Sequence, residues 1–551
     1  MDTAGDGGIV VHGKNFDYSV KNTDDELVAD NVEDETGKML QAEKDPEAPR
    51  SSIVLGAALL DSFKAGKMLP VADAHGNPAH YPGEEDNASK ELVDEAEKDP
   101  EAPRSVLGAA LETFKYLYSM GLLIFSLVIV HAALFSKQTT ATADMGIHPA
   151  AAFFIFWFLI IWLGMMEGGM GALVGLQPID KALYAESHPR TLKNTTLVHK
   201  GDNMERFIVG RQYLVVLVIT VLNLTVSSIK GASVLGLPTW CADVFLGNSV
   251  AIILTTIMIG QLTAQVNAAN CMLDFINNYF MLFTSYVSLG IEFSGLLHCV
   301  YLVQMIFSKI TGQTIDSKEP PRSTVQMLFF WVRVVMSLAI LGFSLAVTIT
   351  ALFDGQTGMW DGVPPYVSVI ILFILMAIIG MMEGMQIALF AVVNLPEEEI
   401  KHYAIAHKNC ELTFRGHNLQ AFLIGRQIFV ATCTFIVARI ATPSYGDDDE
   451  NIFGIADGFQ AFLNSGLTGA VISTIIGSLA WRIIASSFPL AFLSNPLIYA
   501  IIRICLILES SGICSAAWVL ARLNKLIVNF QPDEVYLEGA ENHTAEPSTS
   551  V

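Results

Sequence analysis

The sequence contains little charge, few cysteines and none of the common enzyme motifs. Of its 551 residues, only 16% are charged and seven are cysteine. No GxxxxGK[ST], HExxH or GxSxG pattern is present, which excludes the usual nucleotide-phosphate loop, zinc-protease helix and serine nucleophile. The cysteines form no CxxC pair and no His/Cys metal spacing, so they predict neither a disulfide framework nor a metal centre. We therefore expect a protein that is not an enzyme and has no cofactor.

Apolar sequence is abundant instead. Hydrophobic residues make up 52% of the chain, and its mean hydropathy is +0.47. The runs 150–176 and 366–395 each contain one charged residue, Glu167 and Glu383 respectively, and runs of this length are typical of transmembrane helices. We expect an all-α polytopic membrane protein with about ten spans, at 114–135, 150–176, 206–228, 245–268, 276–308, 325–353, 366–395, 421–441, 465–484 and 489–520.

The sequence also repeats itself. GMMEGG at 164–169 recurs as GMMEGM at 380–385, and each copy is followed by a GRQ motif. The similarity predicts two halves, 106–310 and 311–525, with five spans in each. Because five is an odd number, the second half must enter the membrane in the opposite direction. Such a 5+5 inverted repeat is the architecture of many secondary transporters, whose site lies between the halves.

The two ends of the chain differ from this apolar region. Residues 1–105 are acidic and contain AEKDPEAPRS twice, at 42–51 and 96–105, so we expect a largely disordered region with an internal duplication. Residues 526–551 form a short polar tail without heptads, and no coiled coil is expected there. The loop 177–205 carries more Lys and Arg than its neighbours, which places it and the N-terminus in the cytoplasm.

Carboxylates and amides inside the apolar runs are the candidate functional residues. Glu383 and Gln386 are three residues apart and therefore share one helical face. A carboxylate can ligate Na⁺ and an amide both donates and accepts hydrogen bonds, so the pair suits a small, neutral, polyhydroxylated solute. Glu292 and Glu509 occupy equivalent positions in the two halves, and we interpret them as candidates for a buried ion or proton role.

The GRQ motifs place an arginine and a glutamine at the start of the following span in each half, namely Arg211, Gln212, Arg426 and Gln427. An isolated arginine in the bilayer is costly, so we expect each one to pair with a glutamate of a neighbouring helix or of the other half. Two structural alternatives stay open. The Glu–Arg pairs could stabilise the fold without touching solute, and the glutamines could form interhelical hydrogen bonds.

A polar seam at helical spacing runs through 260–280 and includes Gln265 and Asp274. In the counterpart segment, 477–497, Ala491 stands where Asp274 does, so this aspartate has no equivalent in the second half. A cation site that needs one extra carboxylate could use the asymmetry. The alternative is an aspartate at the end of a span that faces water.

Four intact motifs carry a family resemblance: EGMQ at 383–386, GRQ at 210–212 and 425–427, and CMLD at 271–274. With them the chain resembles the silicon transporters of diatoms over nearly all of 105–525. The resemblance implies Na⁺-coupled uptake of silicic acid, Si(OH)₄, for building the silica wall. It also implies the plasma membrane as the location, with the silica deposition vesicle or another endomembrane as alternatives.

The resemblance further implies which residues form the transport path. It assigns Gln386, Gln212 and Gln427, with Glu383 and Glu167, to the solute or ion path. From the residues themselves we add Arg211 and Arg426 as solute-binding candidates, Asp274, Glu167 and Glu383 as Na⁺ candidates, and Cys271 of the CMLD motif as a further site residue. Silicic acid is uncharged near neutral pH, so amides and carboxylates suffice to bind it, whereas phosphate would call for unpaired arginine. The expected partners are silicic acid, Na⁺ and the lipid bilayer, without nucleic acid and with a homo-oligomer left open.

One motif copy departs from the family pattern. The first half reads EGGM, with Met170 where the pattern has glutamine, and a thioether donates no hydrogen bond. Two other functions therefore stay open: a transport-weak silicic acid receptor, and a carrier of the same fold for another small solute. Restored transport in Met170→Gln would identify the receptor. Competition among solutes would identify a carrier of another small solute.

Overall fold

A computed structural model describes residues 106–229, 231–311, 320, 322–360, 362–392, 395–416, 418–446, 450–533 and 535–536. All of them belong to a single unit of the chain, the one that comprises residues 50–71 and 79–551. Over these residues the protein is almost entirely helical, with two isolated β-bridges and no strand, which confirms the all-α class. The predictions for 1–105 lie outside the described residues.

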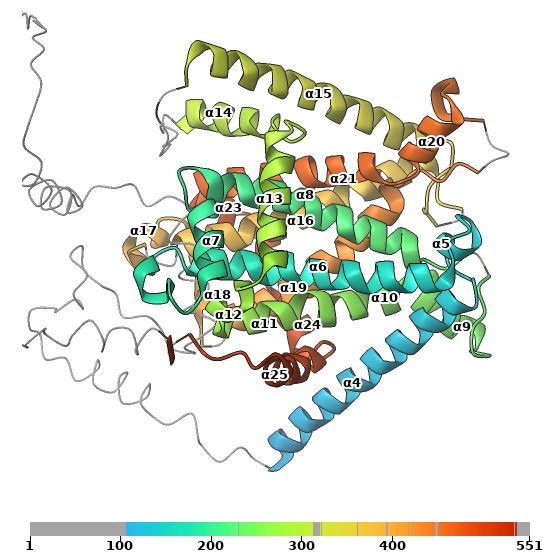
Figure 1. Cartoon of the computed structure of the whole chain (residues 1–551), viewed down its shortest axis with the longest axis horizontal. Helices are drawn as coiled ribbons and strands as arrows, with labels where there is room; N and C mark the ends of the chain where they lie inside the picture. Colours follow the sequence, from blue (N-terminus) through green and yellow to red (C-terminus); the bar gives the residue numbers. More distant parts are fainter. Residues whose placement is uncertain are drawn as a thin grey trace, which may run out of the picture. The chain divides into compact units, whose positions relative to one another are not determined.

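Each long helix of the first half has a counterpart in the second (Figure 1). The first half contains α4 (Val106–Phe135), α5 (Thr140–Ala143), α6 (Pro149–Gly175), η1 (Lys181–Tyr184), α7 (Pro189–Val198), α8 (Asn203–Val226), α9 (Thr239–Ala242), η2 (Asp243–Gly247), α10 (Val250–Thr255), η3 (Thr256–Leu262), α11 (Thr263–Asn270), α12 (Met272–Ile276), α13 (Tyr279–Phe293) and α14 (Val300–Thr311). The second contains α15 (Thr324–Phe353), α16 (Pro365–Val392), α17 (Glu397–Lys401), α18 (Ala404–Phe414), α19 (Asn418–Ala441), η4 (Ile452–Gly454), α20 (Asp457–Leu463), α21 (Leu467–Thr474), η5 (Ile475–Leu479), α22 (Ala480–Ser487), α23 (Pro489–Leu493), α24 (Pro496–Ser510) and α25 (Ala516–Val528).

The duplication extends to irregular features of the backbone. A π-helical turn interrupts the same span in each half, η3 between α10 and α11, and η5 between α21 and α22. Such turns are frequent at functional sites. The two β-bridges, Thr139–Ser228 and Thr357–Pro443, also join corresponding positions. The repeated sequence therefore folds into repeated structure, while the opposite orientation of the halves in the membrane stays a prediction.

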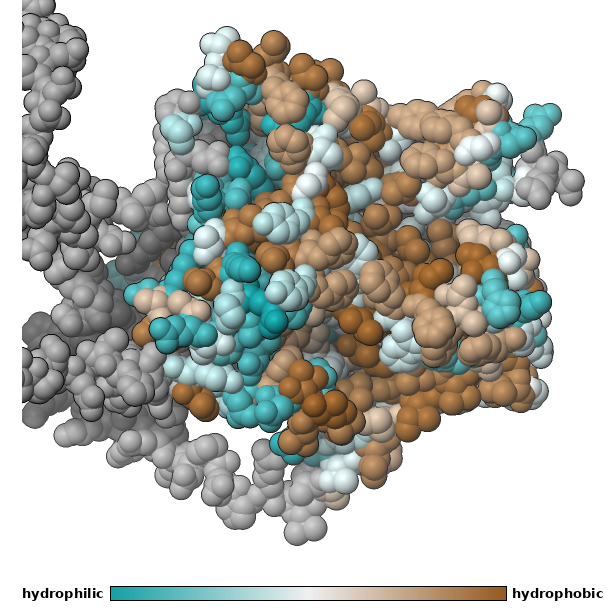
Figure 2. Space-filling model, viewed as in Figure 1, coloured by the Kyte–Doolittle hydropathy of each residue, from teal (hydrophilic) through white to brown (hydrophobic). Residues whose placement is uncertain are grey.

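Eight helices of the described part are long and apolar enough to cross a membrane, four in each half. They are Ala110–Phe135, Pro149–Gly175, Asn203–Val226, Val250–Asn270, Thr324–Phe353, Pro365–Val392, Asn418–Ala441 and Asp457–Ser487. Figure 2 shows apolar side chains dominating the surface over these helices, with hydrophilic side chains gathered toward their ends. A surface of this kind fits lipid rather than water, so the protein is a multi-pass membrane protein.

Two predicted spans, 276–308 and 489–520, differ in the structure. Each is divided into two shorter helices, α13 and α14 in the first case and α24 and α25 in the second. The dividing turns contain Gly295 at φ 87° and Gly512 at φ 72°, in the left-handed region that favours glycine and ends a helix. Because apolar sequence continues through both turns, hydropathy alone does not reveal the break.

The first helix of each half packs on the dividing turn of the other half. On α4, the Ser119 hydroxyl donates to the carbonyl of Ile513 at 2.8 Å and accepts from the amide of Ala516 at 2.9 Å. On α15, Ser337 makes the equivalent pair of bonds, to Leu296 at 2.7 Å and from Cys299 at 3.1 Å. These reciprocal contacts brace the halves against each other.

The glycine of each GRQ motif lies where two helices cross with their backbones in contact. Figure 1 shows α13 running across α6 and α8. A Cβ atom added at Gly210 on α8 would lie 1.9 Å from the carbonyl oxygen of Ser288 on α13. A Cβ atom at Gly425 on α19 would lie 1.8 Å from that of Cys505 on α24. The glycines therefore allow the close approach that positions the adjacent arginine and glutamine.

We expect Gly425→Ala to lower the thermal unfolding midpoint of the detergent-purified protein. The added methyl group meets backbone atoms, which cannot rotate away, and overpacking of this kind costs about 1–3 kcal/mol. Gly290→Ala on α13 is the matched control, because nothing lies within 4 Å of a Cβ atom there and alanine favours a helix. Equal midpoints for the two variants would contradict the close-crossing interpretation.

Candidate functional site

A cavity of about 120 Å³ lies between the two halves. The same three elements of each half line it: α6, α8 and the η3–α11 segment from the first, and α16, α19 and the η5–α22 segment from the second. One water needs roughly 10–15 Å³ on this measure, so the cavity has room for a small solute and several waters. Its position between repeats is the one that transporter sites commonly occupy.

In the first half, Glu167 of α6 holds two partners from neighbouring helices. Its Oε1 lies 3.4 Å from Nη1 of Arg211 on α8. Its Oε2 accepts a hydrogen bond of 3.1 Å from the side-chain amide of Gln265 on α11. Arg211 also donates to the carbonyl of Met166 at 3.4 Å. The predicted Glu–Arg pairing between neighbouring helices is therefore confirmed here.

In the second half, Glu383 of α16 has the equivalent partners, with one change of residue type. Its Oε1 lies 3.6 Å from Nη1 of Arg426 on α19. Its Oε2 accepts from Arg482 on α22, through Nε at 3.0 Å and also through Nη2. Arg482 occupies the position equivalent to Gln265, so Glu383 faces two arginines where Glu167 faces one.

The glutamines of the GRQ motifs are held by the arginines beside them. The side-chain carbonyl of Gln212 accepts from Nη2 of Arg211 at 3.1 Å, and that of Gln427 accepts from Nη2 of Arg426 at 3.1 Å. With each carbonyl occupied in this way, the amide NH₂ is the end available as a donor. Both glutamines line the cavity.

The structure thus brings all seven predicted solute-binding residues to one cavity. Gln386 lines it from α16, and Met170 lines it from the equivalent position on α6. The cavity also includes residues that sequence reasoning did not assign to the site, notably Arg482, Gln265, Gln261 and Ser478. The sequence feature that contains them is the polar seam at 260–280 with its counterpart at 477–497, in which Gln265 aligns with Arg482.

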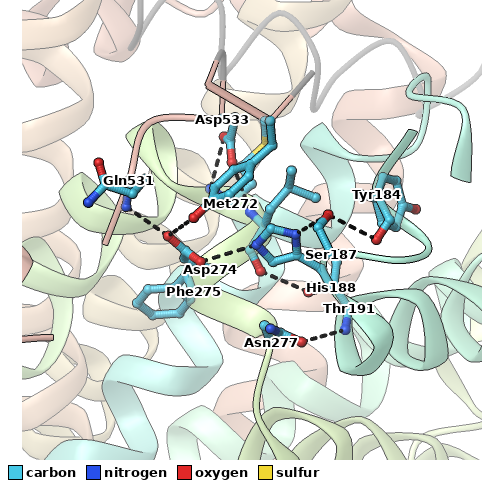
Figure 3. Close-up of polar contacts among 12 residues, drawn as sticks. Tyr184, Ser187, His188, Thr191, Met272, Asp274, Phe275, Asn277, Gln531 and Asp533 are labelled. Atoms are coloured by element: carbon cyan, nitrogen blue, oxygen red, sulfur yellow. Dashed lines mark hydrogen bonds and ion pairs between the residues drawn. The ribbon is translucent and has the colours of Figure 1, made fainter. Parts of the chain in front are cut away.

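Asp274 lies outside this cavity, in a polar cluster with the C-terminal segment, which we define as residues 529–533 and 535–536 (Figure 3). Its Oδ1 is 3.1 Å from Nε2 of His188, and its Oδ2 accepts from the amide of Gln531 at 2.7 Å and from the hydroxyl of Tyr536 at 3.4 Å. The carboxylate therefore faces protein donors, and the structure does not bring it together with Glu167 and Glu383.

The pKa of Asp274 reflects these contacts. Burial alone would raise the pKa, but the hydrogen bonds from His188 and from the Gln531 amide outweigh it, and the pKa lies below the ordinary value of 3.8. A carboxylate with a lowered folded-state pKa adds stability above its unfolded pKa and loses it as the pH falls through the folded value. Its contribution is therefore complete at neutral pH and is lost only in strong acid.

The same C-terminal segment caps the short helix α12. The carboxylate of Asp533 is fully buried and accepts from the backbone amides of Met272 at 2.9 Å and Leu273 at 2.9 Å. An acidic group at this end satisfies free amides and favours the helix dipole. The CMLD motif is thus a docking point for the C-terminal segment.

The other predicted residues also lie away from the cavity. Burial raises the pKa of the Cys271 thiol to about 11, which keeps it protonated and inert. Glu292 is buried, where it accepts from the hydroxyl of Tyr301 at 3.0 Å and lies 3.7 Å from Nε2 of His298. Glu509 is half-buried at the equivalent end of α24. Neither glutamate lines the cavity, and their ion or proton role stays a prediction.

We expect Asp533→Ala to increase hydrogen exchange at the amides of Met272 and Leu273. Removing the acceptor leaves two buried N–H groups unsatisfied, a loss of about 1–3 kcal/mol for each. Peptide-resolved exchange mass spectrometry of the purified protein measures it. Glu186→Ala is the control, since this glutamate is exposed in the neighbouring loop. Unchanged exchange in Asp533→Ala would show that the cap contributes nothing.

Comparison with known proteins identifies the family. The family model of the silicon transporters matches residues 108–550, which is most of the chain and includes both halves. Comparisons with curated proteins and with solved structures returned no match. The chain therefore belongs to the silicon transporter family and is a multi-pass membrane protein of silicic acid transport.

Proposed function

We propose that the protein imports silicic acid together with Na⁺ by alternating access, with the central cavity as the solute site. The observation that carries the proposal is the joint lining of one cavity by equivalent elements of both halves, with Gln212, Gln386 and Gln427 among the lining residues. A site between two repeats becomes accessible to either side of the membrane when one half rocks against the other.

The chemistry of the cavity suits a polyhydroxylated solute. The NH₂ groups of Gln212 and Gln427 would donate to hydroxyl oxygens of silicic acid, because arginines occupy their carbonyls. Gln386 offers both a donor and an acceptor. The glutamates reach the solute only where their contacts with arginine leave a lone pair, so their main role is to hold the arginines and glutamines in place.

For Na⁺ we favour Glu167 among the three predicted residues. Glu383 is held by two arginines, and Asp274 by donors outside the cavity, whereas Glu167 has one arginine and one neutral amide. The buried side-chain oxygen of Gln261, one turn before Gln265 on the facing helix, has no hydrogen-bond partner among the described residues. A carboxylate and an amide oxygen are ligands of the type that hard cations prefer.

We expect Gln386→Ala and Gln427→Ala each to lower kcat/KM for silicic acid uptake about tenfold, because each removes a hydrogen bond to the solute worth about 1 kcal/mol or more. The assay is uptake into proteoliposomes with and without an inward Na⁺ gradient. Gln304→Ala on α14 is the matched control, because this glutamine does not line the cavity.

Three outcomes of that assay are informative. Accumulation that requires the gradient supports the symporter, and entry that ignores the gradient refutes Na⁺ coupling. Unchanged kinetics in both cavity variants, with the protein correctly inserted, refute the assignment of the solute site.

A receptor with weak transport is the second candidate function, and Met170 favours it. This residue lines the cavity at the position equivalent to Gln386, so the first half lacks one amide. If the missing donor limits transport, we expect Met170→Gln to increase the uptake rate severalfold while binding of silicic acid changes little. Met170→Leu is the control for side-chain volume. An uptake rate that is already high and does not respond to Met170→Gln contradicts the receptor.

A further inference from the structure

The charged residues of the cavity do not balance. Three arginines, Arg211, Arg426 and Arg482, line it together with two glutamates, Glu167 and Glu383, and no other charged side chain of the described residues is in its wall. Arginine stays protonated at every physiological pH. With both glutamates ionised, the cavity carries a formal charge of +1.

The excess charge comes from a difference between the halves. In the first half, Gln265 donates to Glu167, and the group is neutral overall. In the second half, Arg482 takes the same position and donates to Glu383, which already faces Arg426. One carboxylate cannot neutralise two guanidinium groups, so one positive charge is left over.

Some guanidinium N–H groups also lack acceptors. Nε of Arg211, and Nε and Nη1 of Arg426, have no hydrogen-bond partner among the described residues. The contact of 3.6 Å between Nη1 of Arg426 and Glu383 is an ion pair that is too long for a hydrogen bond. Arg211 and Arg426 are at least nine-tenths buried. A buried positive charge with unused donors is costly unless an anion compensates it.

We propose that the cavity binds a monovalent anion at its arginines. The proposal rests on the proposed function, in which this cavity is the solute site. Either of two species can supply the single negative charge. One is silicic acid that has lost one proton, and the other is an inorganic halide that binds beside the neutral solute. A dianion would reverse the sign of the site rather than neutralise it. The anion would also offset the repulsion that Na⁺ near Glu167 meets from three arginines.

The test changes the charge at one position in the full-length protein in lipid nanodiscs. Arg482→Gln installs the residue of the first half and brings the formal charge to zero, Arg482→Lys keeps the charge, and Gln265→Arg adds one. Arg503→Gln is the control, because this arginine is exposed and contacts Tyr499 outside the cavity. Calorimetric titration with chloride alone, and with silicic acid in a bulky organic-anion buffer, gives the affinities.

The two titrations distinguish the sources. A halide site predicts chloride binding without silicic acid. If the ionised solute is the ligand, the apparent affinity for silicic acid increases about tenfold for each unit by which the pH is raised toward the first pKa of silicic acid. The reason is that the fraction of the acid present as the anion increases in the same proportion. In either case Arg482→Gln weakens binding about tenfold or more, as expected for a lost charge-assisted contact. Arg482→Lys, which keeps the charge, retains more binding than Arg482→Gln; Arg503→Gln binds as the wild type, and Gln265→Arg binds more tightly.

Two results would overturn the proposal. The first is wild-type protein that binds no chloride and binds silicic acid with an affinity independent of pH. The second is anion binding that is unchanged in Arg482→Gln. If Arg482→Gln does not fold, the anion affinities of the wild type and of Gln265→Arg are compared instead, and equal affinities would reject the proposal. Silicic acid binding that ignores pH and charge, but is lost in Gln386→Ala, rejects the anion and retains the solute site. Binding that Gln386→Ala and Gln427→Ala leave intact rejects the solute site instead.

Discussion

The pairing of buried arginine with buried glutamate is the constraint on which the core of this protein depends. Arg211 with Glu167, and Arg426 with Glu383, place opposite charges on neighbouring helices inside apolar segments. A single charge there would cost far more than a pair, so each pair fixes how its two helices face each other. The arginines then hold the adjacent glutamines, and the glycine before each arginine lets the same helix cross α13 or α24 with the backbones in contact.

The halves share a scaffold but differ in chemistry at the cavity. Met170 replaces the glutamine found at 386, and Gln265 replaces the arginine found at 482. These exchanges leave the backbone pattern intact, including the π-helical turn near the second of them. The first half thus offers a neutral environment beside Glu167, and the second offers positive charge beside Glu383. A cation and an anion could occupy such a cavity together at lower cost than either would alone.

The contacts described above for the C-terminal segment are with the first half. It caps α12 through Asp533 and contacts Asp274, which has Ala491 as its counterpart. The α7 helix is tied to the end of α12 by Asn194, and Asn409 makes the corresponding bond at α23. The end of α12 therefore has the same asparagine contact as the end of α23, and the start of α12 has the Asp533 cap in addition.

The amino-acid sequence by itself determined the membrane-spanning all-α class, the duplication, the family and the residues that belong to the Glu–Arg pairs. Charge inside long apolar runs has few tolerated environments, so its presence alone predicts partners. Only the tertiary structure decided that 276–308 and 489–520 are broken, because a left-handed glycine leaves hydropathy unchanged. It also decided that Asp274 lies outside the cavity and that Arg482 lies inside it. Those placements depend on contacts between segments nearly a hundred or more residues apart, which local periodicity does not record.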